Sequence, residues 1–212
     1  MDLLIILGVA FSASVISTPI LRKLALRFGI VDRPGSRKIH RKPIPYLGGL
    51  GFYASLLAVL LLLIGFQSLH SYWRYEYVPL LVGALLVLAI GLLDDIRGLS
   101  AWTKLPCQIG IGVFMYYSGH LFQLESEQGF SIMRLSNPLD IAGGGLTIGS
   151  IGLIVTVLWY VALMNSVNLI DGMDGLAGGV VCIASGSLFF IALADDNIPV
   201  MIITLIILGG TL

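Results

Sequence analysis

Charged residues are scarce in this chain: Asp, Glu, Lys and Arg make up 11% of its 212 residues. A water-soluble protein carries ~25% charged residues. Together with 57% apolar residues and a mean hydropathy of +0.97, this scarcity excludes an ordinary soluble domain. The net charge is zero, so no overall positive field attracts nucleic acid, and we expect no nucleic-acid partner.

Cysteine is also rare, and the first residues lack the pattern of a cleavable signal peptide. Cys107 and Cys182 both fall within apolar stretches, which provides neither a disulfide framework nor a metal-binding spacing. Met1 and Asp2 precede the first apolar run without the basic residues that begin a signal peptide. We therefore interpret that run as a retained membrane span.

Long apolar runs are what the chain has in abundance. A membrane-spanning helix needs ~20 apolar residues, and the sequence offers seven such stretches, of which the fourth is the most polar. We place them at about 3–21, 47–66, 78–93, 105–122, 146–164, 176–194 and 198–212. The sequence therefore predicts an all-α bundle of six to seven spans forming one transmembrane domain over residues 1–212, with a small outer hairpin around 130–147.

The basic residues predict the orientation of this bundle. Ten of the twelve lie in two connections, which are residues 22–46 and 94–104, and only Arg74 and Arg134 lie elsewhere. Loops rich in Lys and Arg stay in the cytoplasm. We therefore expect an outside N-terminus and cytoplasmic loops at 22–46, 94–104 and 165–175.

Two adjacent carboxylates, Asp94 and Asp95, end the third apolar stretch. Ionised groups near hydrocarbon are costly and usually functional. Their mutual repulsion would be relieved by a cation, and a hard ion such as Mg²⁺ suits oxygen ligands. The alternative is a solvated acidic pair at the end of a helix.

Polar side chains recur at every third position of the 165–175 connection, at Asn165, Asn168, Asp171 and Asp174. A 3₁₀ turn would align all four on one face, whereas an α-helix would spread them around its axis. Aligned, they could bind a metal–diphosphate or a nucleobase. The alternative is a polar loop whose glycines cap two helices.

A basic, proline-containing segment precedes the second apolar stretch and ends in Gly48 and Gly49. Arg41 and Lys42 in this segment could bind a diphosphate or a lipid phosphate through charge-assisted hydrogen bonds. The two glycines would let backbone amides approach such a ligand. The alternatives are an ordinary cytoplasmic basic loop and a surface that docks on anionic lipid heads.

Taken together and in this order, the three segments resemble the polyprenyl-phosphate N-acetylhexosamine-1-phosphate transferases, which are glycosyltransferase family 4. The matching stretches are residues 37–49, the Asp94–Asp95 pair followed by Lys104 and Gln108, and residues 165–175. They span nearly the whole chain. The first stretch looks closer to the GlcNAc-1-phosphate branch than to the pentapeptide branch.

The resemblance implies transfer of a sugar-1-phosphate, GlcNAc-1-phosphate above all, from a UDP-sugar to undecaprenyl phosphate, with release of UMP. It implies Mg²⁺, or Mn²⁺ in its place, in a bacterial inner membrane, and it leaves room for a homodimer. Direct attack by the lipid phosphate and a covalent aspartyl intermediate both stay open, as do the sugar and the glycan pathway. The roles it implies are catalytic for Asp94, Asp95 and Asp171, substrate-binding for Arg41, Lys42, Lys104, Asn165, Asn168 and Asp174, and metal-binding for Asn168 and Asp171.

The chain departs from the family pattern at its end. Further spans, another metal-binding aspartate and a histidine-rich loop do not follow, and Leu212 lies within an apolar run. We therefore expect an N-terminal fragment that is inactive alone.

Two other classes of protein compete with this interpretation. A transporter or channel fragment with a cation-binding cytoplasmic loop would need polar residues in mid-span, and few are present. A CDP-alcohol phosphotransferase would need an Asp-Gly-x-x-Ala-Arg pattern, but Met173 and Asp174 follow Gly172.

Overall fold

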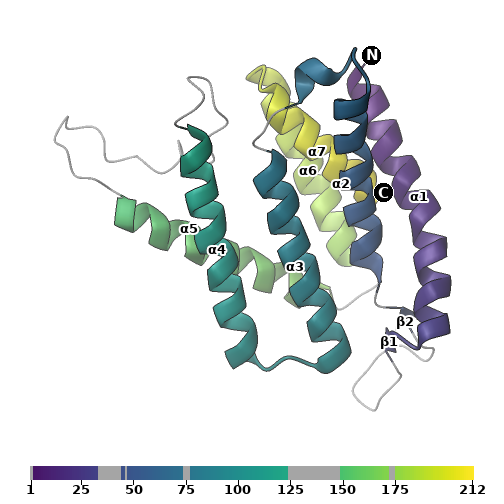
Figure 1. Cartoon of the computed structure of the whole chain (residues 1–212), viewed down its shortest axis with the longest axis vertical. Helices are drawn as coiled ribbons and strands as arrows, with labels where there is room; N and C mark the ends of the chain where they lie inside the picture. Colours follow the sequence, from purple (N-terminus) through teal and green to yellow (C-terminus); the bar gives the residue numbers. More distant parts are fainter. Residues whose placement is uncertain (1, 33–43, 46, 74–76, 124–148, 172–174) are drawn as a thin grey trace.

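The computed structural model describes residues 2–32, 44–45, 47–73, 77–123, 149–171 and 175–212. Nearly all of this part is helical, which confirms the all-α prediction (Figure 1). The α-helices are α1 Asp2–Phe28, α2 Gly48–Gly65, α3 Tyr77–Arg97, α4 Ala101–Gln123, α5 Gly149–Ile170, α6 Leu176–Ala194 and α7 Ile198–Thr211. A short 3₁₀ helix, η1, covers His70–Tyr72.

Each of the seven predicted apolar spans coincides with one of these helices. Helices α1, α2, α3, α5 and α6 are long and apolar enough to cross a membrane, and α7 is a shorter apolar helix. Helix α4, which contains Lys104 and Gln108, is not among the five. Large apolar side chains such as Phe11, Trp159 and Phe190 are exposed on the bundle surface, where lipid would cover them. The chain is a multi-pass membrane protein.

Helices α3 and α5 continue past the ends of their apolar runs. The predicted loop from Asp94 to Lys104 is wrong in its extent, because α3 ends only at Arg97 and α4 begins at Ala101. Gly98 ends the helix: its φ is +64° and its N–H donates to the carbonyl of Asp94 at 2.7 Å. Glycine adopts this left-handed backbone at low cost, so it, rather than the first charged residue, sets the boundary.

The best-packed core joins α1, α2 and α7. Ile6, Val59, Leu63, Ile202 and Ile206 from these helices are almost fully buried in one cluster. Helix α7 approaches α1 closely at Gly209, where an added Cβ would lie 2.8 Å from the Cβ of Ala10. Small residues allow such backbone approach between membrane helices.

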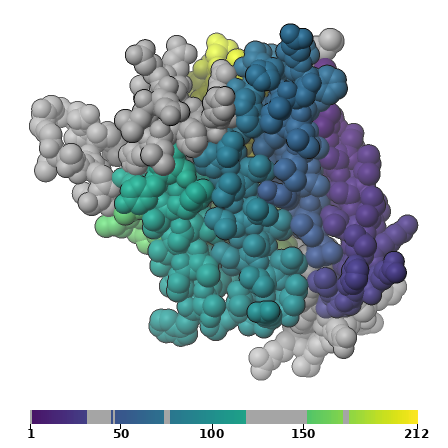
Figure 2. Space-filling view, viewed as in Figure 1, coloured from purple at the N-terminus to yellow at the C-terminus, as the bar shows by residue number. Residues whose placement is uncertain are grey.

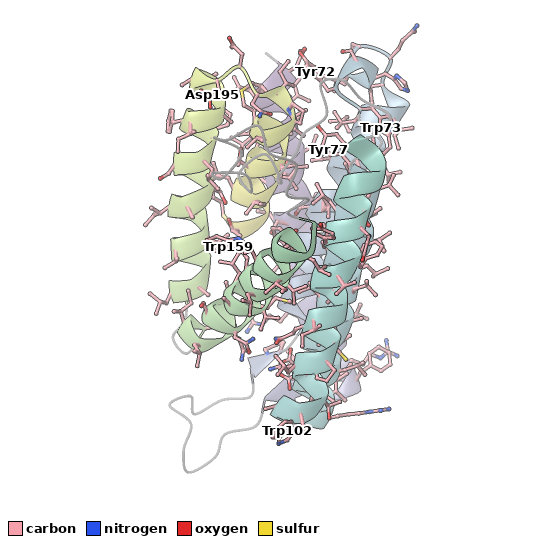
Figure 3. The ribbon with its side chains drawn as sticks, turned by 90° about the vertical axis from the view of Figure 1, so that its left-hand side faces the viewer. Tyr72, Trp73, Tyr77, Trp102, Trp159 and Asp195 are labelled. Atoms are coloured by element: carbon pink, nitrogen blue, oxygen red, sulfur yellow. The ribbon has the colours of Figure 1, made fainter. Side chains whose placement is uncertain are left out.

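Helices α3, α4 and α5 form the rest of the bundle. Helix α3 packs against α2 on one side and α4 on the other. Helices α1 to α4 consequently form one continuous face in chain order (Figure 2). Helix α5 packs on α4 and crosses obliquely behind this face (Figures 1 and 3).

Two very short strands flank the predicted basic segment. β1 (Val31–Asp32) and β2 (Ile44–Pro45) pair antiparallel, with Val31 opposite Pro45 and Asp32 opposite Ile44. This ladder lies between the end of α1 and the start of α2, at the lower end of the bundle in Figure 1. The outer hairpin expected around 130–147 lies outside the described residues.

Candidate functional site

An ion pair joins the end of α3 to the first turns of α4. Lys104 Nζ contacts Asp94 Oδ2, and the two side chains are 19% and 22% exposed, respectively. The other oxygen, Oδ1, accepts a hydrogen bond from the backbone N–H of Leu99 at 3.1 Å. Asp94 therefore fixes the short α3–α4 turn and holds the ammonium group of Lys104 in place.

The two adjacent aspartates have different surroundings in this structure. Consecutive helical residues point ~100° apart, so Asp94 faces Lys104 while Asp95 is exposed in the same last turn of α3. Asp94 thus orients the ammonium group of Lys104, and Asp95 lies at the surface.

A hydrogen bond between two carboxamides joins α4 to α5. Asn165 Nδ2 donates to Gln108 Oε1 at 2.8 Å and also to the carbonyl of Val161 at 2.8 Å. Gln108 is only 5% exposed, so its polar group depends on this partner. Interhelical bonds of this kind stabilise membrane bundles by ~0.6 kcal/mol, and by up to ~1.7 kcal/mol.

Of the two geometries weighed for the four polar side chains, the described positions adopt the α-helical one. Helix α5 remains α-helical to Ile170, and the N–H of Asp171 still donates to the carbonyl of Val167, four residues earlier. Asn165 faces α4, where it bonds to Gln108, whereas Asn168 and Asp171 are exposed. Spaced three residues apart, Asn168 and Asp171 are surface neighbours. Asp174 lies outside the described residues.

Gln108 is a residue of this region to which the sequence alone assigned no role. The detectable signal was its spacing: it follows Lys104 by four residues, which places both side chains on one face of α4. Sequence could not show that Asn165 would be its partner. Arg41 and Lys42, the proposed phosphate-binding residues, lie outside the described residues, although the β1–β2 ladder brings residues 32 and 44 together beside α1 and α2.

The segments that carry these residues lie toward one end of the bundle. The α3–α4 turn and the β1–β2 ladder are both at the lower end of Figure 1, and the N-terminus is at the upper end. Figure 3 shows Trp102 of α4 at that lower end and Tyr72, Trp73, Tyr77 and Asp195 at the other, with α5 descending toward the start of α6. The described parts of the three segments therefore lie toward the same end of the bundle.

The donor atoms at this end are oxygens, of the kind that Mg²⁺ prefers. Asp95, Asn168 and Asp171 expose carboxylate or carboxamide groups. Among the described residues, no group of three or more His, Cys, Asp or Glu side chains is close enough to hold a metal ion. The donor chemistry fits the expected ion, whereas a complete set of protein ligands is not assembled by the described residues alone.

Three buried hydroxyl groups elsewhere in the described spans bond within their own helices. Ser55, Ser118 and Thr204 each donate to a carbonyl of their own helix, at 3.3, 2.7 and 2.8 Å. Such bonds satisfy the hydroxyl group within its own helix. They give no support to the transporter interpretation, which needs polar groups lining a passage.

Comparison with known proteins identifies the family. The model of glycosyl transferase family 4 matches residues 77–212, which include Asp94, Lys104, Gln108 and the whole of α5. This match covers well over half of the chain. The multi-pass membrane protein described above therefore belongs to glycosyl transferase family 4. No solved structure matches the chain.

Curated relatives carry names that describe one kind of reaction. A probable undecaprenyl-phosphate N-acetylglucosaminyl 1-phosphate transferase of Bacillus subtilis is 30% identical, over 96% of this chain and 53% of its own. A decaprenyl-phosphate N-acetylglucosaminephosphotransferase of Mycolicibacterium smegmatis is 29% identical, over 90% and 47%. An undecaprenyl-phosphate alpha-N-acetylglucosaminyl 1-phosphate transferase of Escherichia coli K12 is 29% identical, over 83% and 43%. The chain spans about half the length of these relatives.

Proposed function

We propose that the protein transfers a sugar-1-phosphate, with GlcNAc-1-phosphate as the first candidate, from a UDP-sugar to undecaprenyl phosphate. An oxygen of the lipid phosphate attacks the β-phosphorus of the UDP-sugar. The bond from that phosphorus to the bridging oxygen breaks, and UMP leaves with the electron pair. The product is an undecaprenyl diphosphate sugar, which would begin a lipid-linked glycan of the cell envelope.

This proposal is supported by a held cation and exposed oxygen-bearing side chains that lie toward the same end of a family 4 bundle. Lys104, kept in place by Asp94, is positioned to bind a phosphate through a charge-assisted hydrogen bond. The names of the curated relatives, which specify undecaprenyl or decaprenyl phosphate, support a polyprenyl phosphate as the acceptor. Arg41 and Lys42 would add positive charge for the donor diphosphate.

The exposed polar residues at the end of α5 are proposed to bind the donor, which is the UDP-sugar. Asn168 and Asp171 on α5, with Asp174 beside them, would bind the UDP-sugar and its divalent ion. A bound Mg²⁺ would neutralise the diphosphate charge that builds up as UMP leaves. Phosphoryl transfer depends mainly on such positioning and charge stabilisation.

Little proton removal is required of the protein. A phosphate monoester has a second pKa of ~6, so the acceptor is largely dianionic near neutral pH. Asp95 is proposed to lie against the reacting groups, whereas Asp94 acts through Lys104. We also propose that this end faces the cytoplasm of the bacterial inner membrane, where the UDP-sugar would be available.

The test is a transfer assay with membranes from cells that express the complete protein. Donors labelled in the sugar-phosphate group, including UDP-GlcNAc, are supplied with undecaprenyl phosphate and Mg²⁺. The proposal expects the label in the lipid fraction and one UMP released for each sugar-phosphate transferred. Label that stays entirely water-soluble with every UDP-sugar would refute it.

A further inference from the structure

An apolar cavity of about 350 Å³ lies among α2, α3, α4 and α5. Its walls include Phe52 of α2, Ala84 and Val87 of α3, Met115 of α4 and Tyr160 of α5. This volume is within the ~300–1,000 Å³ range of ligand pockets. The sequence patterns did not indicate this cavity, and the proposed reaction assigns no role to it.

The cavity begins close to the polar end described above. Leu88, in its wall, precedes Asp94 by six residues on α3, or ~9 Å along the helix axis. On α4, Ile111 follows Gln108 by less than one turn. On α5, Tyr160 precedes Asn165 by five residues, or ~7.5 Å. An apolar space therefore lies one to two helical turns from the Asp94–Lys104 pair.

We infer that this cavity binds the isoprene units next to the phosphate of the acceptor lipid; the inference rests on the proposed function. A polyprenyl phosphate combines an anionic head with an apolar, methyl-branched chain. The held ammonium of Lys104 complements the head, and the adjoining apolar walls complement the chain. A cationic site within one to two helical turns of an apolar space suits a prenyl lipid better than a water-soluble ligand.

The size of the cavity sets how much of the chain it holds. A methylene group is about the size of a water molecule, which occupies ~30 Å³ in the liquid. One five-carbon unit then needs ~150 Å³, so the cavity holds about two units, and the remaining chain lies in the bilayer. Met115 suits a branched ligand because its unbranched thioether adapts to irregular shapes.

A substitution that fills the cavity should weaken binding of the acceptor lipid and leave binding of the UDP-sugar unchanged. Ala84→Phe places a ring in the space, whereas Ala89→Phe adds the same ring at an exposed position five residues along α3. Displacing about two methylene groups costs about tenfold in affinity. We expect Ala84→Phe to raise the KM for undecaprenyl phosphate about tenfold without changing the KM for the UDP-sugar. Ala89→Phe should change neither, and equal effects of the two variants would overturn the inference.

Photolabelling of the unmutated protein tests whether the cavity binds the isoprene units even if Ala84→Phe fails to fold. The probe is a polyprenyl phosphate with a diazirine on the isoprene unit next to the phosphate, used with the complete protein in membranes. We expect labelled peptides of α3 and α4 that contain Ala84 or Met115, with protection by undecaprenyl phosphate and none by a straight-chain phospholipid.

The two hypotheses fail differently in this experiment. Labelling confined to other helices, or equal protection by the phospholipid, would overturn the cavity assignment while sugar-phosphate transfer continued. Absence of transfer by the unmutated protein would instead refute the proposed function.

Discussion

Asn165 on α5 donates a hydrogen bond from Nδ2 to Oε1 of Gln108 on α4, across 2.8 Å. The acceptor is almost completely buried, and the donor lies one turn before Asn168. This bond therefore couples the helix that carries Lys104 to the helix that carries Asn168 and Asp171. From this bond we infer that Asn165 positions the two helices, and the substrate-binding role that the family resemblance implied stays a prediction.

A double-mutant cycle measures this coupling. Asn165→Leu leaves the buried Gln108 without its partner, which costs ~1–3 kcal/mol, whereas replacing both residues can be nearly neutral. Gln108→Leu removes the interhelical bond but leaves Asn165 bonded to the carbonyl of Val161. We expect each single variant to lower the unfolding temperature of the protein in detergent and the double variant to recover much of the loss. The coupling energy should be ~0.6–1.7 kcal/mol. Strictly additive losses would show that the hydrogen bond does not join the helices.

Replacing Lys104 tests whether its ammonium group binds the acceptor phosphate. A charge-assisted hydrogen bond contributes ~1.5–3 kcal/mol, so Lys104→Met should raise the KM for undecaprenyl phosphate by about 10- to 100-fold. Lys104→Arg, which keeps the charge, should recover part of this loss. Arg97→Met is the matched control, because it removes a positive charge from the exposed last turn of α3. A similar rise in KM with Arg97→Met would point to a general charge effect instead.

The orientation of the bundle follows from labelling two engineered cysteines. In protein whose Cys107 and Cys182 are replaced by alanine, Ser100→Cys marks the α3–α4 turn and Asp195→Cys marks the opposite end. Ser100 and Asp195 are both exposed. A membrane-impermeant maleimide should label Asp195→Cys in intact cells, and Ser100→Cys only after permeabilisation. Labelling of Ser100→Cys in intact cells would place the candidate site outside.

Much of the fold could be predicted from the sequence because lipid imposes a simple rule. A span must be apolar and must satisfy its own backbone, so each of the seven apolar runs became a helix. Helix ends were harder to predict. Gly98 sets the end of α3 by its left-handed backbone, four residues beyond the first carboxylate.

The candidate site could be predicted only in part, because its geometry depends on contacts between helices. The spacing of Asn165, Asn168 and Asp171 suggested one aligned face, but the backbone stays α-helical and Asn165 turns to Gln108. Similarly, the neighbouring aspartates looked equivalent in sequence. A turn of only three residues between α3 and α4 brings Lys104 to Asp94 and leaves Asp95 exposed.

If the exposed carboxylates at the Lys104 end take part in sugar-phosphate transfer, Asp171→Asn should impair it. The variant removes one charge at an exposed position with little change of shape, so the fold should persist. In the transfer assay we expect a loss of about a hundredfold or more, as is typical when a group that stabilises transition-state charge is removed. Asp195→Asn, an exposed aspartate at the opposite end of the bundle, should transfer at the unmutated rate. Full activity of Asp171→Asn would contradict the account.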